Sequence, residues 1–331
     1  MTEPGWIRWT PPLTVVWCTV YAIVHASWAI GDAPDFGDLG ESFLPEGWTP
    51  VVPAASAAIV AALAGTRAAP SRPASWVLAV LAWSCGIALL LYAFMFPLSL
   101  LMALGALFGQ PVSRADLVVL LAQGAGAVAG VLASAIAVLA QRRARAACAR
   151  CGRVHGRSPE KRGAPSPLWA YLAAYLTIAA CLVRLGAAVP RGALWRTSPG
   201  TSATFLLTFV ALMVLAGTLL PLALVHRWGR IWPAWVGPLA GRPVPRWLVL
   251  GPALFLGAGL TSYFGIGGGT AVATGMVAPD WFLVVALASY TLWGVGLLVS
   301  ASSYLALTRP ECPAGRASAA PAPAERRTRA A

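Results

Sequence analysis

The sequence predicts an all-α fold: a polytopic membrane bundle of about eight transmembrane helices, arranged as two tandem four-helix repeats. The first observation is composition, since 58% of the 331 residues are hydrophobic and 11% are charged, against about 45–50% and 25% in soluble globular domains. The second is that apolar runs of about 20 residues, the length that crosses a hydrocarbon core, recur along the chain. The third is a strongly basic loop between two such runs, which orients the chain.

The expected spans divide the chain into two halves. Residues 1–140 form the first four-helix half and residues 168–307 the second, with the basic loop 141–167 between them. Residues 308–331 are expected to form a disordered tail, and residues 97–114 are a candidate for partial re-entry into the membrane. The eight spans fall at about residues 13–30, 51–65, 76–96, 117–140, 168–189, 204–225, 247–266 and 281–307.

Charge placement orients these spans. The loop 141–167 holds eight of the 24 Lys and Arg residues and a single acid, Glu160. With eight spans and both termini in the cytoplasm, 20 of the 24 bases lie on the cytoplasmic side, as the positive-inside rule requires. We therefore expect a multi-pass protein of the cell (plasma) membrane. Its net charge of +13 predicts contact with membrane lipids, including anionic headgroups of the inner leaflet, and not with nucleic acid.

Identical residues 171 positions apart suggest an internal duplication. Spans one and five also correspond loosely, through Tyr21 and Tyr175. Because each half has four spans, the halves would share one orientation and be related by an axis along the membrane normal. Chance matching is the alternative, but Trp, Gly and Tyr matches are less common by chance than Ala and Leu matches. The identical pairs are Trp76/Trp247, Ala82/Ala253, Gly86/Gly257, Leu89/Leu260 and Tyr92/Tyr263.

The end of the first span holds a candidate outward-facing site, formed by Tyr21, His25 and Trp28 and followed by Asp32 and Asp35 in an acidic loop. The three ring-bearing residues share one helix face through their i, i+4, i+7 spacing. An ionisable residue inside a span is a functional candidate by default. A neutral His25 could bind a metal or relay a proton, whereas a charged one would need a nearby carboxylate. The alternative is a structural histidine that is hydrogen-bonded to a neighbouring helix.

A second candidate site lies in the basic loop. Cys148, Cys151 and His155 form a C-x-x-C…H pattern that resembles half of a zinc site. Cys312 of the tail lies on the same side of the membrane in this topology and could supply the fourth ligand. Zinc is therefore the one candidate cofactor. The alternative is two reduced thiols in a flexible cytosolic loop.

Glycines mark two positions of interest. Gly126 and Gly130 lie on a small-residue ridge of span four, which allows close helix packing within the bundle or across a homo-oligomer. The run Gly265–Gly269 predicts a flexible or broken end of span seven, or a plain turn; such breaks line substrate sites in some transporters. Arg184, near the outer end of span five, is expected to snorkel to the interface or to pair with the acidic loop.

The loop between spans six and seven interleaves Arg with Trp. Indole rings favour the headgroup level and Arg attracts anionic lipid, so this loop predicts an interfacial elbow on the inner leaflet. The residues expected at the lipid interface are Arg227, Trp228, Arg230, Trp232 and Trp235.

Two motifs carry a resemblance. The pattern His25-x-x-Trp28-Ala-Ile-Gly31 and the Arg-Trp-Gly-Arg…Trp-Pro…Pro-Arg-Trp pattern of residues 227–247 are similar to those of uncharacterised multi-pass integral membrane proteins of high-GC bacteria. The resemblance implies a membrane location and brings no established activity.

Three functions are open at this point. The first is transporter-like handling of a small or lipid-like molecule between the two halves, which the parallel repeat and the glycine-rich span seven favour. The second is a membrane-embedded enzyme or metal-binding protein acting at the outward Tyr/His/Asp site. The third is an accessory scaffold that recruits a partner through its basic cytoplasmic loop. The sequence has no Walker motif, no H-E-x-x-H and no G-x-S-x-G in a nucleophile-elbow setting, so enzymatic activity stays undecided.

Overall fold

The computed structural model describes residues 5–31, 33–34, 47–66, 71–109, 111–148, 161–192 and 203–309. Within these ranges the regular secondary structure is helical. One isolated antiparallel β-bridge joins Ile231 to Pro243. Seven of the described helices are long and apolar enough to cross a membrane. The predicted all-α membrane bundle is therefore confirmed.

The first half consists of four longer helices and one short one. Local signals set their starts: the Ser71 hydroxyl accepts the N–H of Ala74 at the start of the third helix, and Ser113 and Asp116 form a capping box at the start of the fifth. The elements are α1 (Gly5–Ile30), α2 (Val51–Ala64), α3 (Arg72–Tyr92), α4 (Phe96–Gly105) with the 3₁₀ turn η1 (Ala106–Phe108), and α5 (Arg114–Ala144).

The second half also contains four long helical stretches among its described residues. Its seventh predicted span is a single 28-residue helical stretch, Arg246–Ala273, whose middle adopts π-helical geometry. The elements are α6 (Leu168–Ala188), α7 (Ala203–Val225), the 3₁₀ turns η2 (Arg227–Gly229) and η3 (Ala234–Leu239), α8 (Arg246–Leu260), the π-helix η4 (Thr261–Gly268), α9 (Gly269–Ala273) and α10 (Trp281–Leu307).

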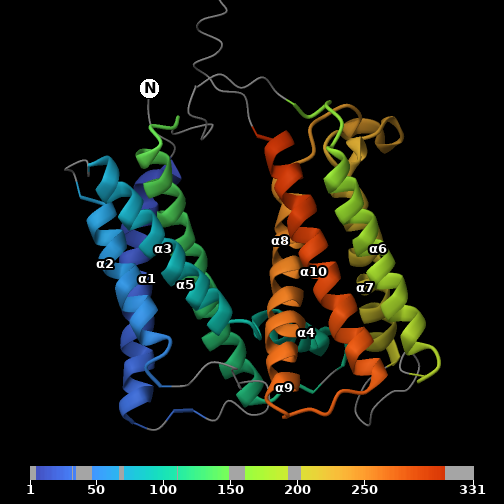
Figure 1. Ribbon diagram of the computed structural model, residues 1–331, viewed down its shortest axis with the longest axis horizontal. Helices are drawn as coiled ribbons and strands as arrows, with labels where there is room; N and C mark the ends of the chain where they lie inside the picture. The colour runs from blue at the N-terminus through green and yellow to red at the C-terminus, as the bar shows by residue number, and fades with distance from the viewer. Residues whose placement is uncertain are drawn as a thin grey trace, which may run out of the picture.

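The second predicted span is the short helix α2. Its 14 residues correspond to about 21 Å of helix, less than the roughly 30 Å of a hydrocarbon core, because it begins after Pro50 and ends at Gly65. Even so, α2 reverses the chain, so that α1 and α3 begin at the same end of the molecule (Figure 1). The number of crossings thus depends on whether this short helix crosses.

Helix direction alternates, and this gathers the bases at one end. The helices α1, α3, α6 and α8 begin where α2, α5, α7 and α10 finish (Figure 1), and we call this the basic end. Twelve of the fifteen described Lys and Arg residues lie at or beyond helix termini there; the others, Arg114, Arg184 and Arg191, lie towards the opposite end. That the basic end faces the cytoplasm remains a prediction.

Similar glycine contacts join α3 to α5 and α8 to α10. A Cβ atom on Gly86 would lie 3.1 Å from the carbonyl oxygen of Gly130, and one on Gly257 would lie 3.1 Å from that of Gly294. Glycine at these positions lets the two backbones approach each other directly. Gly130 therefore serves packing inside the bundle, the first of the two roles predicted for it.

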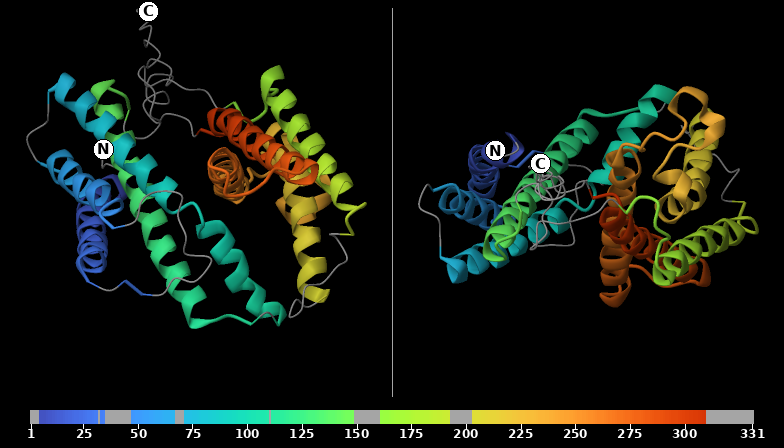
Figure 2. Two further views of the ribbon diagram at one scale, coloured as in Figure 1. Left: turned by 60° about the horizontal axis from the view of Figure 1, so that its bottom comes forward. Right: turned by 90° about the horizontal axis from the view of Figure 1, so that it is seen from above.

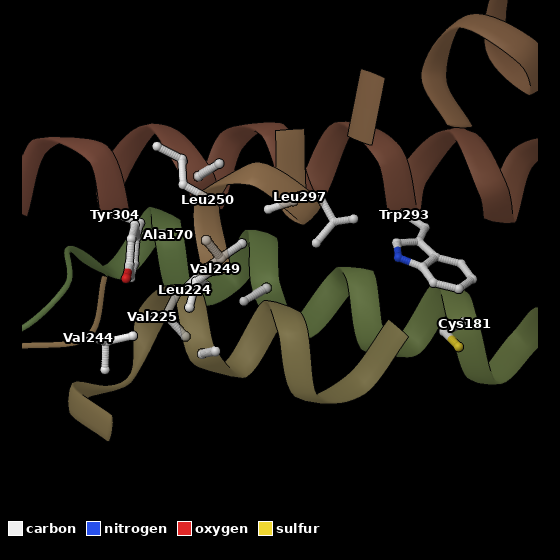
Figure 3. Close-up of a cluster of buried hydrophobic side chains, with 14 of the residues drawn as sticks. Ala170, Cys181, Leu224, Val225, Val244, Val249, Leu250, Trp293, Leu297 and Tyr304 are labelled. Carbon is white, nitrogen blue, oxygen red and sulfur yellow. The ribbon is translucent and has the colours of Figure 1, made fainter. Parts of the chain in front are cut away.

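The core of the second half lies between α6, α7, α8 and α10 (Figure 3). Leu250, Leu297 and Tyr304 lie in it and have exposures of 1%, 0% and 0%. The Tyr304 hydroxyl donates a hydrogen bond of 2.9 Å to the carbonyl oxygen of Gly229, just beyond α7. The last helix therefore holds the loop between α7 and α8 in place.

The two halves form separate groups of helices. Figures 1 and 2 show α1, α2, α3 and α5 on one side and α6, α7, α8 and α10 on the other. Each group has its own buried clusters. The short helix α4 belongs to the first half in sequence but also packs against α8. It therefore connects the two groups at the end opposite to the basic end.

Candidate functional site

The structure brings the three predicted aromatic-ring residues of α1 together. The ring of His25 lies 4.2 Å from that of Tyr21 and 4.7 Å from that of Trp28, measured between centroids. Tyr21 and His25 are buried, with exposures of 5% and 6%. They share one helix face, which is turned towards the other helices of the first half.

Two neighbouring helices complete this cluster. Tyr92, the last residue of α3, meets His25 edge to face with centroids 6.0 Å apart. On α5, a Cβ atom at Gly126 would lie 2.8 Å from the Tyr21 hydroxyl oxygen, so Gly126 makes room for the phenol. The indole of Trp17 donates a hydrogen bond of 3.0 Å to the Ala125 carbonyl oxygen beside it. The predicted glycine ridge is thus part of the same site as Tyr21 and His25.

Two buried polar atoms in this region lack a partner. Among the described residues, neither the Tyr21 hydroxyl nor Oε1 of Gln123 makes a hydrogen bond. Gln123 is 7% exposed and lies one turn before Gly126 on the same face of α5. A buried polar group without a partner costs about 1–3 kcal/mol, so each of these atoms favours a water molecule or a polar ligand atom as its partner. Gln123 is not among the predicted site residues, although a single amide side chain inside an apolar span can be recognised in the sequence as a candidate polar contact.

The acids of the predicted outward site, Asp32 and Asp35, lie outside the described residues. The cluster as described therefore has a phenol, an imidazole and an amide but no carboxylate. Such a set can donate and accept hydrogen bonds. Metal binding or proton relay by a neutral His25, and the pairing of a charged His25 with one of the two acids, stay predictions.

The zinc proposal also falls largely outside the described part of the chain. Cys148 is described and is half-buried, whereas Cys151, His155 and Cys312 lie outside the described residues. In the described ranges, no three His, Cys, Asp or Glu residues lie close enough to hold a metal ion. A zinc site at this place stays a prediction.

The loop after α7 differs from its prediction at one residue. Trp228 and Trp235 are exposed, by 41% and 85%, as expected of residues at a lipid interface, and Arg227 is exposed beside them. Trp232 is half-buried. Arg230, however, is only 1% exposed and points into the protein.

Arg230 is buried because it satisfies backbone carbonyl groups. Its guanidinium donates hydrogen bonds to the carbonyl oxygens of Ala164, at 2.6 Å, and Val225, at 3.5 Å. Val225 ends α7, where a cation also interacts favourably with the helix dipole. Burial lowers the pKa of this guanidinium below its ordinary value. The prediction of an interfacial Arg230 is therefore wrong: this arginine fastens the loop to the basic end of the second half.

The two halves meet through aromatic side chains. Phe94, in the turn before α4, stacks on Tyr263 of η4 with ring centroids 6.1 Å apart. Phe96 of α4 meets Phe255 of α8 edge to face at 5.9 Å. We call these contacts between α4, with its preceding turn, and the α8–η4 helix the junction.

Glycines of the α8–η4 helix allow this close approach. A Cβ atom on Gly259 would lie 2.7 Å from Cγ of Pro97, and one on Gly267 would lie 3.3 Å from the ring of Phe94. The chain stays helical through the predicted break at Gly265–Gly269, in π geometry up to Gly268 and in α geometry from Gly269. Short π-helical segments are rare and occur frequently at functional sites.

No protein-family model matches this chain, and comparisons with curated proteins and with solved structures find no match. Its function is therefore inferred from its own residues.

Proposed function

We propose that this membrane protein is transporter-like and handles a small or lipid-like molecule between its two halves. The observation that carries the proposal is the junction: two separately packed four-helix groups touch through a glycine-rich π-helical segment at the end opposite to the basic end. Alternating access in several transporter folds is a rocking of one repeat against the other around a site at their interface. Within the described residues the main contact between the two groups is the junction, and a π-helical segment at this contact is suited to that motion.

Duplication of the halves supports the proposal, and the burial pattern supports duplication. At a spacing of 163 residues, Thr14 matches Thr177 and Cys18 matches Cys181, and all four have an exposure of 0%. Each threonine also donates a hydrogen bond to the carbonyl four residues earlier. This register replaces the correspondence of Tyr21 with Tyr175.

The third helices of the halves, α3 and α8, and the last helices, α5 and α10, also correspond. Ala82 and Ala253, paired by the predicted spacing, are 1% and 0% exposed. At a spacing of 164 residues, α5 matches α10, and this pairs Gly130 with Gly294 at the two glycine contacts. We infer that the halves descend from one four-helix unit in a single orientation.

Relative motion of the halves can be measured by double electron–electron resonance, which gives the distribution of distances between two spin labels on the protein in nanodiscs. One label at Ala74→Cys, at the start of α3, and one at Ala306→Cys, near the end of α10, report across the halves at the basic end; both positions are exposed. The control pair is Leu168→Cys with Ala306→Cys, inside the second half, and Cys148, Cys151 and Cys312 are changed to serine. We expect a broad or two-peaked distance distribution across the halves and a narrow one for the control.

A junction variant gives the matched test. Gly259→Leu places a side chain against Pro97 and should shift the distribution across the halves, while Gly251→Leu in the same helix has no atom within 4 Å of its Cβ position and should not. The control pair should be unchanged in both variants. If the pair across the halves is as narrow as the control and insensitive to Gly259→Leu, the halves form one rigid body and the proposal fails.

A further inference from the structure

Arg184 lies one turn before the end of α6, away from the basic end, and does not extend freely into solvent. Its guanidinium carbon lies 4.9 Å from the ring centre of Phe282 and 5.2 Å from that of Tyr290, both on α10. Its Nε atom is buried and, among the described residues, has no hydrogen-bond acceptor. Snorkelling to the interface, one of the two predicted roles, would bring the guanidinium into the headgroup region. It does not explain why the guanidinium lies between two rings and why its Nε–H group is buried without an acceptor.

The nearby acid is already occupied. Asp280 is the only acidic residue of the sequence between Glu160 and Glu311. It accepts the N–H of Leu283 at 2.7 Å, as the cap of α10, and forms an ion pair of 2.5 Å with Arg191. These two interactions lower the pKa of the Asp280 carboxyl, the backbone hydrogen bond being the larger cause. Within the described residues Arg184 has no carboxylate, so this corner of the second half carries a surplus positive charge.

A second cation shares the same aromatic ring. The guanidinium carbon of Arg191 lies 5.1 Å from the ring centre of Phe282, which Arg184 also contacts. The Asp280 carboxylate neutralises Arg191. The guanidinium of Arg184 keeps its positive charge and therefore attracts an anion to this ring. Guanidinium groups bind carboxylate and phosphate oxygens in a bidentate manner, and their weak hydration suits a partly desolvated site.

We propose that Arg184, between α6 and α10, binds the anionic group of a ligand, a carboxylate or a phosphate, with the rings of Phe282 and Tyr290 as the walls of the site. The shared chemistry is that of a lipid headgroup or of a soluble organic anion. The proposal rests on the proposed transporter-like function and names the class of its ligand. The binding measurements below do not depend on whether the two halves move.

The site is connected to the junction. Tyr290 stacks on Phe264 of η4 with centroids 4.1 Å apart, Phe264 meets Tyr263 at 4.8 Å, and Tyr263 stacks on Phe94 of the first half. Packed rings of this kind form a contiguous contact path, along which a change at one end can bias the arrangement at the other. An anion at Arg184 is therefore placed to act on the contact between the halves.

Two binding measurements separate the ligand sources. In the first, native mass spectrometry of protein released from nanodiscs compares lipid retention in phosphatidylglycerol and in phosphatidylcholine. In the second, inorganic phosphate is titrated onto protein in a neutral detergent, with tryptophan fluorescence as the readout. We expect Arg184→Gln to weaken binding roughly tenfold or more in one of the two measurements, since hydrogen bonds to charged groups are worth about 1.5–3 kcal/mol.

Two further variants separate binding from structural damage. Arg246→Gln removes an arginine that also stacks on an indole, 5.3 Å from the Trp247 ring, but at the basic end, and should leave binding unchanged. Asp280→Asn keeps a capping side chain but releases Arg191, so it should tighten binding, which loss of structure would not do. Lipid retention lost in Arg184→Gln assigns a headgroup, and phosphate affinity lost assigns a soluble anion. Equal binding by wild type, Arg184→Gln and Arg246→Gln in both measurements overturns the proposal, whatever the spin-label distances show.

Discussion

Replacing Arg230 with leucine should lower the free energy of unfolding of the second half by about 3 kcal/mol, since each hydrogen bond of a buried charged group is worth about 1.5–3 kcal/mol. The guanidinium joins three segments: the end of the basic loop at Ala164, the end of α7 at Val225, and its own turn. Leucine fills part of the space but donates no hydrogen bond to either carbonyl oxygen. The Val225 oxygen keeps the Ser166 hydroxyl, at 2.7 Å, so the loss falls mainly on Ala164.

Arg227 is the matched control for this prediction. It lies three residues earlier in the same turn and is exposed, so Arg227→Leu should change stability by less than about 1 kcal/mol. Thermal unfolding of both variants in one detergent, followed by circular dichroism, gives the comparison. Equal midpoints for the two variants would mean that Arg230 is not held as described and would restore an interfacial role.

The second large effect is expected at the glycine contacts. Gly130→Leu should destabilise the protein by about 2–3 kcal/mol, the scale of overpacking in a close-packed core, because a Cβ atom there would already lie 2.7 Å from Cγ of Leu90 and 3.0 Å from the Gly86 carbonyl oxygen. The backbone of α3 cannot yield as a side-chain end can. Gly294→Leu should have an effect of similar size in the second half, since its Cβ atom would lie 2.9 Å from the Gly257 carbonyl oxygen.

Gly186→Leu serves as the control, because its Cβ position in α6 has no atom within 4 Å. Urea or thermal unfolding in detergent measures the three variants side by side. The duplication predicts that Gly130→Leu and Gly294→Leu resemble each other and differ from Gly186→Leu. A large effect in one half only would indicate that the two glycine contacts are not equivalent.

Helix ends were predictable where local signals define them. The eighth predicted span coincides with α10, Trp281–Leu307, because its apolar run starts directly after the capping residue Asp280. The first span was predicted too short, since α1 extends back to Gly5 through Pro11 and Pro12, which favour the first turns of helices but seldom occur deeper inside them. Apolar length is a reliable signal for a membrane helix, whereas proline within it obscures the boundary.

Tertiary contacts explain what the sequence did not reveal. Arg230 and Arg227 occupy the same motif, and only the fold of the loop, held by Tyr304 and by the bridge of Ile231 with Pro243, buries one and exposes the other. The π geometry of η4 likewise follows from its neighbours in space. The face shared by Tyr21, His25 and Trp28 was predictable, because helical spacing alone determines it. That Oε1 of Gln123 is buried without a partner became apparent only from the packing of α5 in the fold.

The measurement that tests the architecture most directly is side-specific thiol labelling, because the proposed relation between the two halves needs both of them to begin at the same membrane face. In a background without Cys148, Cys151 and Cys312, single cysteines replace Gly5, Ser71 or Met276, which are all exposed. We expect an impermeant maleimide to label Met276→Cys in intact cells, and to label Gly5→Cys and Ser71→Cys only after permeabilisation. If Gly5→Cys and Ser71→Cys react from opposite sides, α2 does not cross the membrane, and the account of two parallel four-helix halves is contradicted.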